Sequence, residues 1–400
     1  MRLLFVDDDP SIVQMLETVV EALEPTWQTQ SADSGSRALR LMEENRFDVI
    51  ISDMGMPGMT GAQLLNEVMR RYPETSRILL SGYSEHDHLF SSFGITHQFL
   101  PKPFAIPAFQ AALHRIRGLR EMLRSEQLQK LLPRNRSLPA LPAVYFKILE
   151  TQQDPACSVE RIAEVLSDDS ELSAKILEKI NGGSFTNGRE VSTAAEAVRL
   201  LGADTIGSLA IGVHLFSAFN GPGLDGSWVD DLWRHSLTVA QVARKVALLE
   251  TGSGDLAEQA FTAGLLHETG RLLFARTSSA PYAQLIARAS QENKSLLQIE
   301  HEVLGATHAE VGGCLLHLWG LSTPISEAVA FQYEPSRATD RALSPLTVLH
   351  AANILEEAAR SQIPGEVMLR LDSRYFAELG ISDRLSVWQK AASEPAQTAR

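Results

Sequence analysis

The sequence predicts a multidomain protein in which an α/β domain with a five-stranded, doubly wound parallel sheet is followed by an all-helical domain. Two observations predict this division. In residues 1–120, short apolar runs alternate with helical patterns, as in parallel sheets that are covered by helices. From residue 138 onward the strand patterns stop, and successive helical patterns are separated by Gly, Pro and Asn.

The composition fits two or three domains in a cytoplasmic protein. The chain has 400 residues, 44% of them hydrophobic, and one domain usually takes about 100–200 residues. The two cysteines, Cys157 and Cys314, stand outside any C-x-x-C cluster, so we expect free thiols in a reducing compartment. The apolar run Leu3–Val6 is too short for a signal peptide. No segment reaches the roughly 18 apolar residues of a membrane span, so we expect no membrane partner.

The charge disfavours a nucleic-acid partner. The formal net charge is −13 at pH 7, which repels a phosphate backbone. The most basic stretch, Arg115–Arg124, also contains glutamate and follows a helical pattern. A nucleic-acid-binding second domain is therefore the weaker alternative, and it would show steeply salt-dependent affinity for DNA.

Strands and helices alternate regularly through the first domain. The predicted strands are Arg2–Val6, Trp27–Ser31, Asp48–Ser52, Ile78–Ser81 and Gln98–Leu100. The predicted helices are Ile12–Leu23, Ser36–Glu44, Ala62–Arg71, Glu85–Phe93 and a segment from Ile106 onward. In such sheets the functional side chains lie beyond the carboxyl ends of the strands.

The rest of the chain is predicted to be helical throughout. A helical linker over residues 121–137 leads into a domain over 138–335, which a helical C-terminal extension over 336–400 follows, with a frayed tail from Ser393. The predicted helices are Ala143–Gln152, Val159–Leu166, Glu171–Asn181, Thr193–Leu201, Asp204–Ala218, Trp228–Glu250, Leu256–Phe274, Tyr282–Gln291, Leu296–Leu304, Thr307–Trp319, Ile325–Gln332 and Pro345–Arg360.

Charged and hydroxyl groups follow four of the predicted strands. Asp7 and Asp8 follow the first strand, Asp53 the third, Ser81 the fourth and Lys102 the fifth. Three converging carboxylates and one lysine suit a hard divalent cation and a phosphoryl group that is being transferred. The sequence therefore predicts a Mg²⁺-dependent phosphoryl site at this edge of the sheet.

Helix capping is the alternative role for the first acidic residues. An Asp-Asp pair at the end of a strand can simply cap the helix that follows. We expect Asp9, with Ser11 two residues later, to serve as that cap. Asp7 and Asp8 are then left for the site that Asp53 and Lys102 share.

Over roughly residues 1–120 the chain resembles the receiver domains of response regulators, of the CheY-like superfamily. The resemblance rests on four stretches: Leu4–Asp8, Ile51–Gly61, Leu80–Gly82 and Lys102–Phe104. It implies a flavodoxin-like fold, phosphorylation by a sensor histidine kinase, and Mg²⁺ as cofactor. It also implies a cis peptide bond between Lys102 and Pro103.

The resemblance assigns a role to each residue of the receiver site. Asp53 is the expected phosphoacceptor, and Asp7, Asp8, Asp53 and the Gly55 carbonyl are the expected Mg²⁺ ligands. Ser81 and Lys102 would contact the phosphoryl group, and Phe99 would act as the aromatic switch. Phosphorylation would add about −1.5 to −2 charge units beside the fourth strand, draw Ser81 toward the phosphate and let Phe99 turn inward.

Histidines in the second domain resemble the metal-binding order of the HD superfamily of phosphohydrolases. In that superfamily a histidine, a His-Asp pair and a later aspartate bind the metal that activates water. Here His235 comes first, His267 and Glu268 form the pair, and Asn353 stands where the later aspartate is expected. Because asparagine is neutral, we interpret these four residues as a degenerate HD site.

The segment before His235 resembles the HD-related output domain, abbreviated HDOD, over about residues 133–335. The resemblance rests on stretches such as Leu138–Pro142, Ile162–Glu164, Lys175–Leu177 and Leu200–Gly202. Members of that family are regarded as regulatory modules without hydrolase activity that act through protein contacts.

The predicted function is therefore that of a two-component response regulator. Phosphorylation of Asp53 would switch a non-catalytic output domain whose partner is an unidentified protein or a second copy of the chain. The chain is thus not expected to be an enzyme. The alternative is a metal-dependent phosphohydrolase of cyclic dinucleotides or nucleotides that uses His235, His267, Glu268 and His308.

Overall fold

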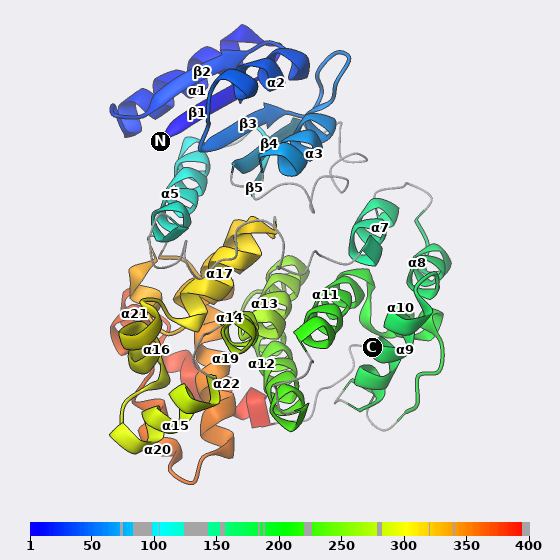
Figure 1. The fold of residues 1–400 in the computed structure, drawn as a ribbon, viewed down its shortest axis with the longest axis vertical. Helices are drawn as coiled ribbons and strands as arrows, with labels where there is room; N and C mark the ends of the chain where they lie inside the picture. The colour runs from blue at the N-terminus through cyan, green and yellow to red at the C-terminus, as the bar shows by residue number, and fades with distance from the viewer. Residues whose placement is uncertain are drawn as a thin grey trace. The chain divides into compact units, whose positions relative to one another are not determined.

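A computed structural model (Figure 1) describes most of the chain. The described residues are 1–72, 75–82, 98–103, 105–123, 143–152, 157–182, 185–186, 189–219, 226–277, 282–319, 321–338 and 341–393. They form an α/β unit that begins at the N-terminus and a helical unit that includes most of the later helices. The predicted helix Glu85–Phe93 and most of the predicted linker, residues 124–137, lie outside the described residues.

The α/β unit contains the five-stranded parallel sheet that the sequence predicts. The strands run in the order β2-β1-β3-β4-β5, and every neighbouring pair is parallel. Their bounds are β1 Arg2–Val6, β2 Gln28–Ala32, β3 Val49–Asp53, β4 Ser76–Gly82 and β5 Gln98–Lys102. The predicted second and third strands begin one residue too early. Asp48 lies just before β3, where its Oδ2 accepts a hydrogen bond of 2.7 Å from the Arg2 amide.

Helices cover both faces of this sheet. They are α1 Pro10–Leu23, α2 Gly35–Glu44, α3 Gly61–Arg71 and α5 Ile106–Leu123. Successive strand residues point to opposite faces, so Leu4 and Ile50 pack in one core with residues of α2 and α3. Phe5 and Ile51 pack in the other core with residues of α1 and α5. This two-sided burial explains the continuous apolar runs of the central strands.

Asp9 caps α1, as the sequence predicts. Its side chain accepts a hydrogen bond of 2.8 Å from the Ser11 amide. The capping role therefore belongs to the third aspartate of the run, and Asp7 and Asp8 are available for the edge of the sheet.

The helical unit is built mainly of helices of 8–26 residues. They are α7 Ala143–Gln152, α8 Val159–Ser167, α9 Ser170–Asn181, α10 Ala194–Leu201, α11 Ala203–Phe219, α12 Gly226–Thr251, α13 Gly254–Leu266, α14 Thr269–Thr277, α15 Tyr282–Glu292, α16 Leu296–Leu304, α17 His308–Leu318, α18 Thr323–Phe331, α19 Pro345–Arg360, α20 Pro364–Met368, α21 Ser373–Glu378 and α22 Leu385–Ser393. Their order confirms the all-helical class of this part of the chain.

The prediction of one helix over Leu256–Phe274 is wrong, because the structure divides it into α13 and α14. The break falls at His267 and Glu268. Close backbone packing explains it: a Cβ atom on Gly270 would lie 1.9 Å from the carbonyl oxygen of His308 on α17. The chain must therefore turn before Gly270 to bring α14 against α17.

The last helices pack onto the helical unit. The α19 helix lies against both α12 and α13, and α22 lies against α12 and α19. Trp388 on α22 is fully buried, and its indole nitrogen donates a hydrogen bond of 2.7 Å to Glu250 Oε1 at the end of α12. Arg384 pairs with the same carboxylate at 2.8 Å.

Among the described residues, no single helix has the length and apolar character needed to cross a bilayer. Two consecutive segments, Ala194–Leu201 and Ala203–Ser217, reach the threshold only together and meet at a bend of 116°.

We predict that Trp388→Ala lowers the free energy of unfolding of the helical unit by about 3–5 kcal/mol, because it empties a closed site and removes the hydrogen bond to Glu250. Urea denaturation followed by circular dichroism measures the loss. The matched control is Val387→Ala, since the Val387 side chain is 36% exposed and its truncation should cost little. Equal losses in both variants would mean that α22 is not docked as described.

Candidate functional site

Acidic residues and one lysine gather at the carboxyl edge of the sheet. Asp7 and Asp8 directly follow β1, Asp53 ends β3 and Lys102 ends β5. All these strands are parallel, so their carboxyl ends lie at one edge. Carboxylate oxygens of Asp7, Asp8 and Asp53 lie within 4.8 Å of one another.

Lys102 joins two of the carboxylates. Its Nζ lies 2.9 Å from Asp7 Oδ2 and 2.5 Å from Asp53 Oδ1. The side chains of Asp7 and Asp53 are 4% and 11% exposed, whereas Asp8 is exposed to solvent. The site therefore has two buried carboxylates that pair with Lys102 and one carboxylate that is exposed to solvent.

The pKa values of the paired groups follow from burial and hydrogen bonding. Burial raises the pKa of the Asp7 carboxyl, although hydrogen bonds from Lys102 and the Asp9 amide oppose the shift. For Lys102 burial acts to lower the pKa, but hydrogen bonds to Asp53 and Asp7 outweigh it and raise the pKa overall. Lys102 is therefore protonated at neutral pH.

The residues of this edge fit a magnesium ion. Three carboxylates face one ammonium group, so excess negative charge is left for a divalent cation to neutralise. Oxygen donors are what Mg²⁺ prefers. The Gly55 amide donates a hydrogen bond of 2.8 Å to Asp53 Oδ2, which holds that peptide beside the expected phosphoacceptor.

Two predicted switch residues are described only as parts of strands. Ser81 lies in β4 opposite Pro101, and Phe99 lies in β5 opposite Leu79. The side chains of Ser81 and Phe99 lie outside the described residues, so their roles stay predictions. The Lys102–Pro103 peptide bond is cis, as predicted.

The site also requires glycine at position 61, a residue to which the sequence analysis gave no role. A Cβ atom at this position would lie 2.0 Å from the carbonyl oxygen of Asp53. The Gly61 amide also donates a hydrogen bond of 3.0 Å to the Met54 carbonyl. Only glycine lets the start of α3 approach the end of β3 so closely, which fixes the loop that follows Asp53.

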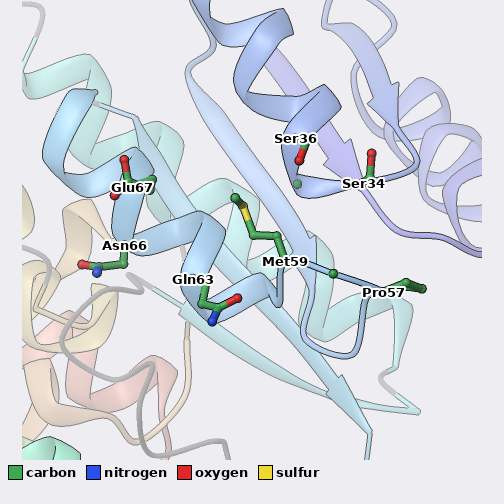
Figure 2. A pocket seen from close by; sticks show the side chains of 9 residues that line it. Ser34, Ser36, Pro57, Met59, Gln63, Asn66 and Glu67 are labelled. Carbon is green, nitrogen blue, oxygen red and sulfur yellow. The ribbon is translucent and has the colours of Figure 1, made fainter.

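An open hollow lies beside this loop, but Asp7, Asp8 and Asp53 are not among the residues that line it (Figure 2). It measures about 520 Å³, and Ser34, Pro57, Met59 and Glu67 are among the residues that line it. The charged group among these four, Glu67, already pairs with Arg70 and Arg71. The hollow therefore lacks the charge pattern of a phosphoryl site.

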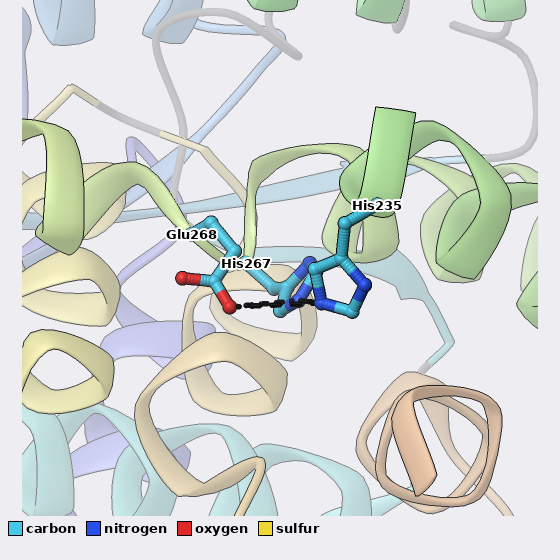
Figure 3. Close-up of side chains that lie close together, drawn as sticks. All are labelled: His235, His267 and Glu268. Atoms are coloured by element: carbon cyan, nitrogen blue, oxygen red, sulfur yellow. Dashed lines mark hydrogen bonds and ion pairs between the residues drawn. The ribbon is translucent and has the colours of Figure 1, made fainter. Parts of the chain in front are cut away.

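A second cluster lies in the helical unit (Figure 3). His235 comes from α12, and His267 and Glu268 come from the break between α13 and α14. The two Nε2 atoms lie 3.2 Å apart, and Glu268 Oε1 lies 3.4 Å from His267 Nε2 and 3.7 Å from His235 Nε2. The side chains of His267 and Glu268 are buried, and that of His235 is 12% exposed.

Asn353 is linked to this cluster by two hydrogen bonds through Gln332. Its Nδ2 donates a hydrogen bond of 3.3 Å to Gln332 Oε1, and Gln332 Nε2 donates one of 3.0 Å to the His267 carbonyl. Three of the four predicted residues, His235, His267 and Glu268, thus meet directly. Asn353 contacts the backbone side of the pair through Gln332.

Glu356 is a residue of this cluster that the sequence analysis missed. It lies one helical turn after Asn353 on α19, and its Oε2 is 2.8 Å from His235 Nδ1. Its Oε1 pairs with Arg360 at 2.9 Å. A spacing of three residues on one helix places Glu356 and Asn353 on the same face, which is the signal that could have found it.

A buried glutamate holds His308, the further histidine named in the sequence analysis. Glu300 accepts hydrogen bonds from the His308 amide at 2.9 Å, from His308 Nδ1 at 2.8 Å and from the Tyr282 hydroxyl. His308 Nε2 lies 3.1 Å from the Tyr333 hydroxyl. Both ring nitrogens of His308 are thus engaged. His301, the neighbour of Glu300, is exposed.

Electrostatics favour an ionised Glu268 beside a neutral His267. Burial acts to raise the pKa of Glu268, but the charge of the nearby Arg271 opposes it, and the pKa lies well below its usual range. Burial lowers the pKa of His267. Glu268 therefore carries a negative charge at neutral pH inside the helical unit.

Two protein-family models match the chain. The response regulator receiver domain matches residues 3–114, and the HDOD domain matches residues 138–335. Together these matches cover the sheet with its acidic edge and the helices that carry His235, His267 and Glu268.

Known proteins are similar to portions of the chain. The DNA-binding transcriptional regulator NtrC of Escherichia coli (strain K12) is 33% identical over 111 residues, which are 28% of this chain and 23% of NtrC. An uncharacterized protein of Treponema pallidum (strain Nichols) is 22% identical over 243 residues, 60% of this chain and 46% of that protein. The chain therefore spans less than half the length of these relatives.

Solved structures include an HDOD domain protein of unknown function from Geobacter sulfurreducens. It is 21% identical, with a TM-score of 0.49, over 68% of this chain and 97% of that one.

We predict that Gly61→Ala destabilises the α/β unit by about 1–3 kcal/mol, because the added methyl group overlaps the Asp53 carbonyl and forces the backbone apart. Chemical denaturation measures the change. Gly365→Ala is the matched control, since no described residue beyond its own stretch of helix lies within 4 Å of the position that its Cβ would take. An unchanged stability in Gly61→Ala would contradict the close approach of α3 to β3.

Proposed function

Because the chain is a response regulator in which a receiver domain is fused to an HDOD output domain, we propose that phosphorylation of Asp53 switches the HDOD domain between states that bind a protein partner differently. One observation carries the first half of this proposal. Lys102 Nζ contacts both Asp7 and Asp53 at the edge of the sheet where Asp8 also lies.

The phosphoryl transfer is a displacement at phosphorus. A carboxylate oxygen of Asp53 forms the new bond to phosphorus while the bond to the histidine or acyl phosphate donor breaks. The ammonium group of Lys102, which pairs with Asp53, then shifts to a phosphoryl oxygen and neutralises part of its charge. Asp7, Asp8, Asp53 and the Gly55 carbonyl would hold the Mg²⁺ ion, which would neutralise part of the phosphoryl charge.

The product changes the charge of an edge that is already acidic. A phosphoryl group on Asp53 adds about −1.5 to −2 charge units at neutral pH. The ammonium of Lys102 then has a stronger partner than Asp7, so the ion pairs rearrange. We propose that Ser81 and Phe99, on the neighbouring strands β4 and β5, transmit this change to the outer face of the sheet.

The HDOD domain acts by binding and not by hydrolysis in this proposal. Asn353 supplies no carboxylate to the cluster, and its amide is hydrogen-bonded to Gln332. Both ring nitrogens of His308 are held, one by Glu300 and the other by Tyr333. These contacts support a cluster without the full ligand set of an HD hydrolase.

The partners and the location follow from this function. The receiver implies a phosphodonor such as a sensor histidine kinase. We propose that the chain acts in the cytoplasm, where such kinases present their phosphohistidine. The output partner is another protein or a second copy of the chain.

A metal-dependent phosphohydrolase is the second candidate, and one observation favours it. His235, His267 and Glu268 meet as metal ligands would. Incubating the purified chain with cyclic dinucleotides and nucleotides, in the presence of added metal, separates the two functions. We expect no turnover. Turnover that disappears in His267→Ala would replace the binding function with the hydrolytic one.

We predict that acetyl phosphate, with Mg²⁺, adds one phosphoryl group to the wild-type chain and none to Asp53→Asn, because the amide of asparagine is no nucleophile. Intact-mass spectrometry measures the addition. Asp33→Asn, which changes a carboxylate that is 66% exposed, pairs with Arg37 and stands outside the cluster of Asp7, Asp8 and Asp53, should be labelled like the wild type. Labelling that persists in Asp53→Asn would show that the acceptor is another residue.

We predict that beryllofluoride changes which proteins the wild-type chain retains in a pull-down, because it mimics the aspartyl phosphate, and that it has no such effect on Asp53→Asn. The retained proteins are compared by mass spectrometry. Identical sets with and without beryllofluoride for the wild type would contradict a phosphorylation-dependent output.

A further inference from the structure

The ring of His350 joins three parts of the helical unit. His350 belongs to α19 and is 1% exposed. Its Nδ1 lies 2.6 Å from the carbonyl oxygen of Gln332, which directly follows α18. Its Nε2 lies 3.0 Å from the backbone amide nitrogen of Asp372, which precedes α21. One imidazole therefore holds the end of α18 and the start of α21 against α19.

The two hydrogen-bond partners fix the protonation state of this ring. A carbonyl oxygen only accepts, so Nδ1 of His350 carries a hydrogen. A backbone amide only donates, so Nε2 carries none and accepts from Asp372. While α21 lies against α19, His350 is therefore the neutral ring with its hydrogen on Nδ1.

Protonation of His350 would set two donors against each other. A hydrogen on Nε2 would face the N–H group of Asp372, which would lose its acceptor. The Asp372 carboxylate is a poor substitute as partner of the protonated ring, because Oδ1 already accepts from the Tyr375 amide at 3.0 Å and Oδ2 accepts from the Ser336 hydroxyl. The hydrogen bond between α19 and the start of α21 thus requires an uncharged ring.

Aromatic side chains complete the packing of α21 on α19. Tyr375 and Phe376 are fully buried. The Tyr375 hydroxyl lies 2.8 Å from Thr347 Oγ1 on α19. The centre of the Phe376 ring lies 6.0 Å from that of the His350 ring. Because α21 has only six residues, it is too short to remain helical in water without these contacts.

The surroundings of His350 favour the neutral ring. Burial lowers its pKa, while the hydrogen bond to the Gln332 carbonyl and the charge of Asp372 oppose that shift without reversing it. Besides Asp372, the titratable side chains on the elements that contact this ring are Glu327 on α18, Tyr333 beside Gln332, and Arg374, Tyr375 and Glu378 on α21. Arg374 and Glu378 pair with each other at 2.9 Å. Among the described residues, the charge that acts on the ring is that of Asp372.

We propose that the segment Asp372–Glu378 is a pH-sensitive latch, which is closed on α19 while His350 is neutral and opens when the ring is protonated. Opening exposes Tyr375 and Phe376 together with the face of α19 that they cover. The latch lies beyond residues 138–335, which match the HDOD model. It requires no phosphorylation of Asp53, so its failure would leave the proposed function unchanged.

The latch weakens as the pH falls. In the open segment His350 has the ordinary pKa of about 6.5, whereas burial holds its pKa lower in the closed state. The open state therefore binds more protons, and acid favours it. The equilibrium constant for opening should change little above about pH 7.5 and rise by up to about tenfold between about pH 7.5 and 5.5.

The Asp372 carboxylate stays ionised over this pH range. Burial acts to raise its pKa, but hydrogen bonds from Ser336 and the Tyr375 amide oppose that shift, and the pKa lies below its usual value. The cap that Asp372 provides for α21 is therefore kept, and the predicted change belongs to a histidine.

Hydrogen–deuterium exchange of the full-length chain, followed by mass spectrometry, tests the proposal. Exchange is measured at about pH 7.5 and 5.5 and is corrected for the intrinsic exchange rate at each pH. We expect the protection of the α21 amides to fall by about 5–10-fold at the lower pH. The amides of α9, a helix without histidine, should keep their protection.

Variants assign the change to His350. In His350→Gln the amide can still donate to Gln332 and accept from Asp372, but it does not titrate in this range. We expect equal protection of α21 at the two pH values in this variant, whereas His301→Gln, which alters an exposed histidine in the same way, should behave like the wild type. If α21 is unprotected in His350→Gln even at the higher pH, the shorter amide of His350→Asn takes its place.

NMR of the chain with ¹³C-labelled histidine rings provides a second readout that requires no closed variant. The resonance that is missing from His350→Gln or His350→Asn belongs to His350, and in the wild type it should titrate below about pH 6.5.

Three results would overturn the proposal. The first is a wild-type protection of α21 that is the same at both pH values. The second is an equal loss of protection in the wild type and in a closed amide variant, which would assign the pH dependence to another group. The third is a His350 ring that titrates at or above the ordinary pKa of histidine.

Discussion

The contact of Lys102 with Asp7 and Asp53 is the interaction on which the account of the α/β unit depends. Like charges repel, and a cation held between them stabilises two ionised carboxylates that are only 4% and 11% exposed. The parallel sheet supplies that arrangement, because β1, β3 and β5 all end at one edge. Because these ion pairs balance the charge of the unphosphorylated edge, a phosphoryl group added there changes the balance.

The sequence was sufficient for the sheet and its edge. Strands that are buried on both faces leave continuous apolar runs, and each run here ends at a polar residue such as Asp7 or Asp53, so the strand ends could be located closely. The shift of one residue in β3 has a local cause, because the Asp48 side chain accepts a hydrogen bond from the Arg2 amide just before the strand begins. The roles of Ser81 and Phe99 stay predictions, because their side chains lie outside the described residues.

The helical unit was less predictable because its cluster depends on how helices cross. The helical pattern of Leu256–Phe274 gives no sign of the break at His267 and Glu268, after which Gly270 packs closely against the His308 backbone. Similarly, family order pointed to Asn353, whereas the carboxylate that reaches His235 belongs to Glu356. Such choices between neighbouring turns of a helix are made by packing, which sequence periodicity does not resolve.

The most direct test of the central claim is chemical mapping of the phosphorylated residue. Borohydride reduces an aspartyl phosphate to homoserine, so the chain is phosphorylated with acetyl phosphate, reduced, digested and sequenced by mass spectrometry. We expect homoserine at position 53 and at no other aspartate. Homoserine at Asp7, Asp8 or elsewhere, with intact aspartate at position 53, would contradict the account.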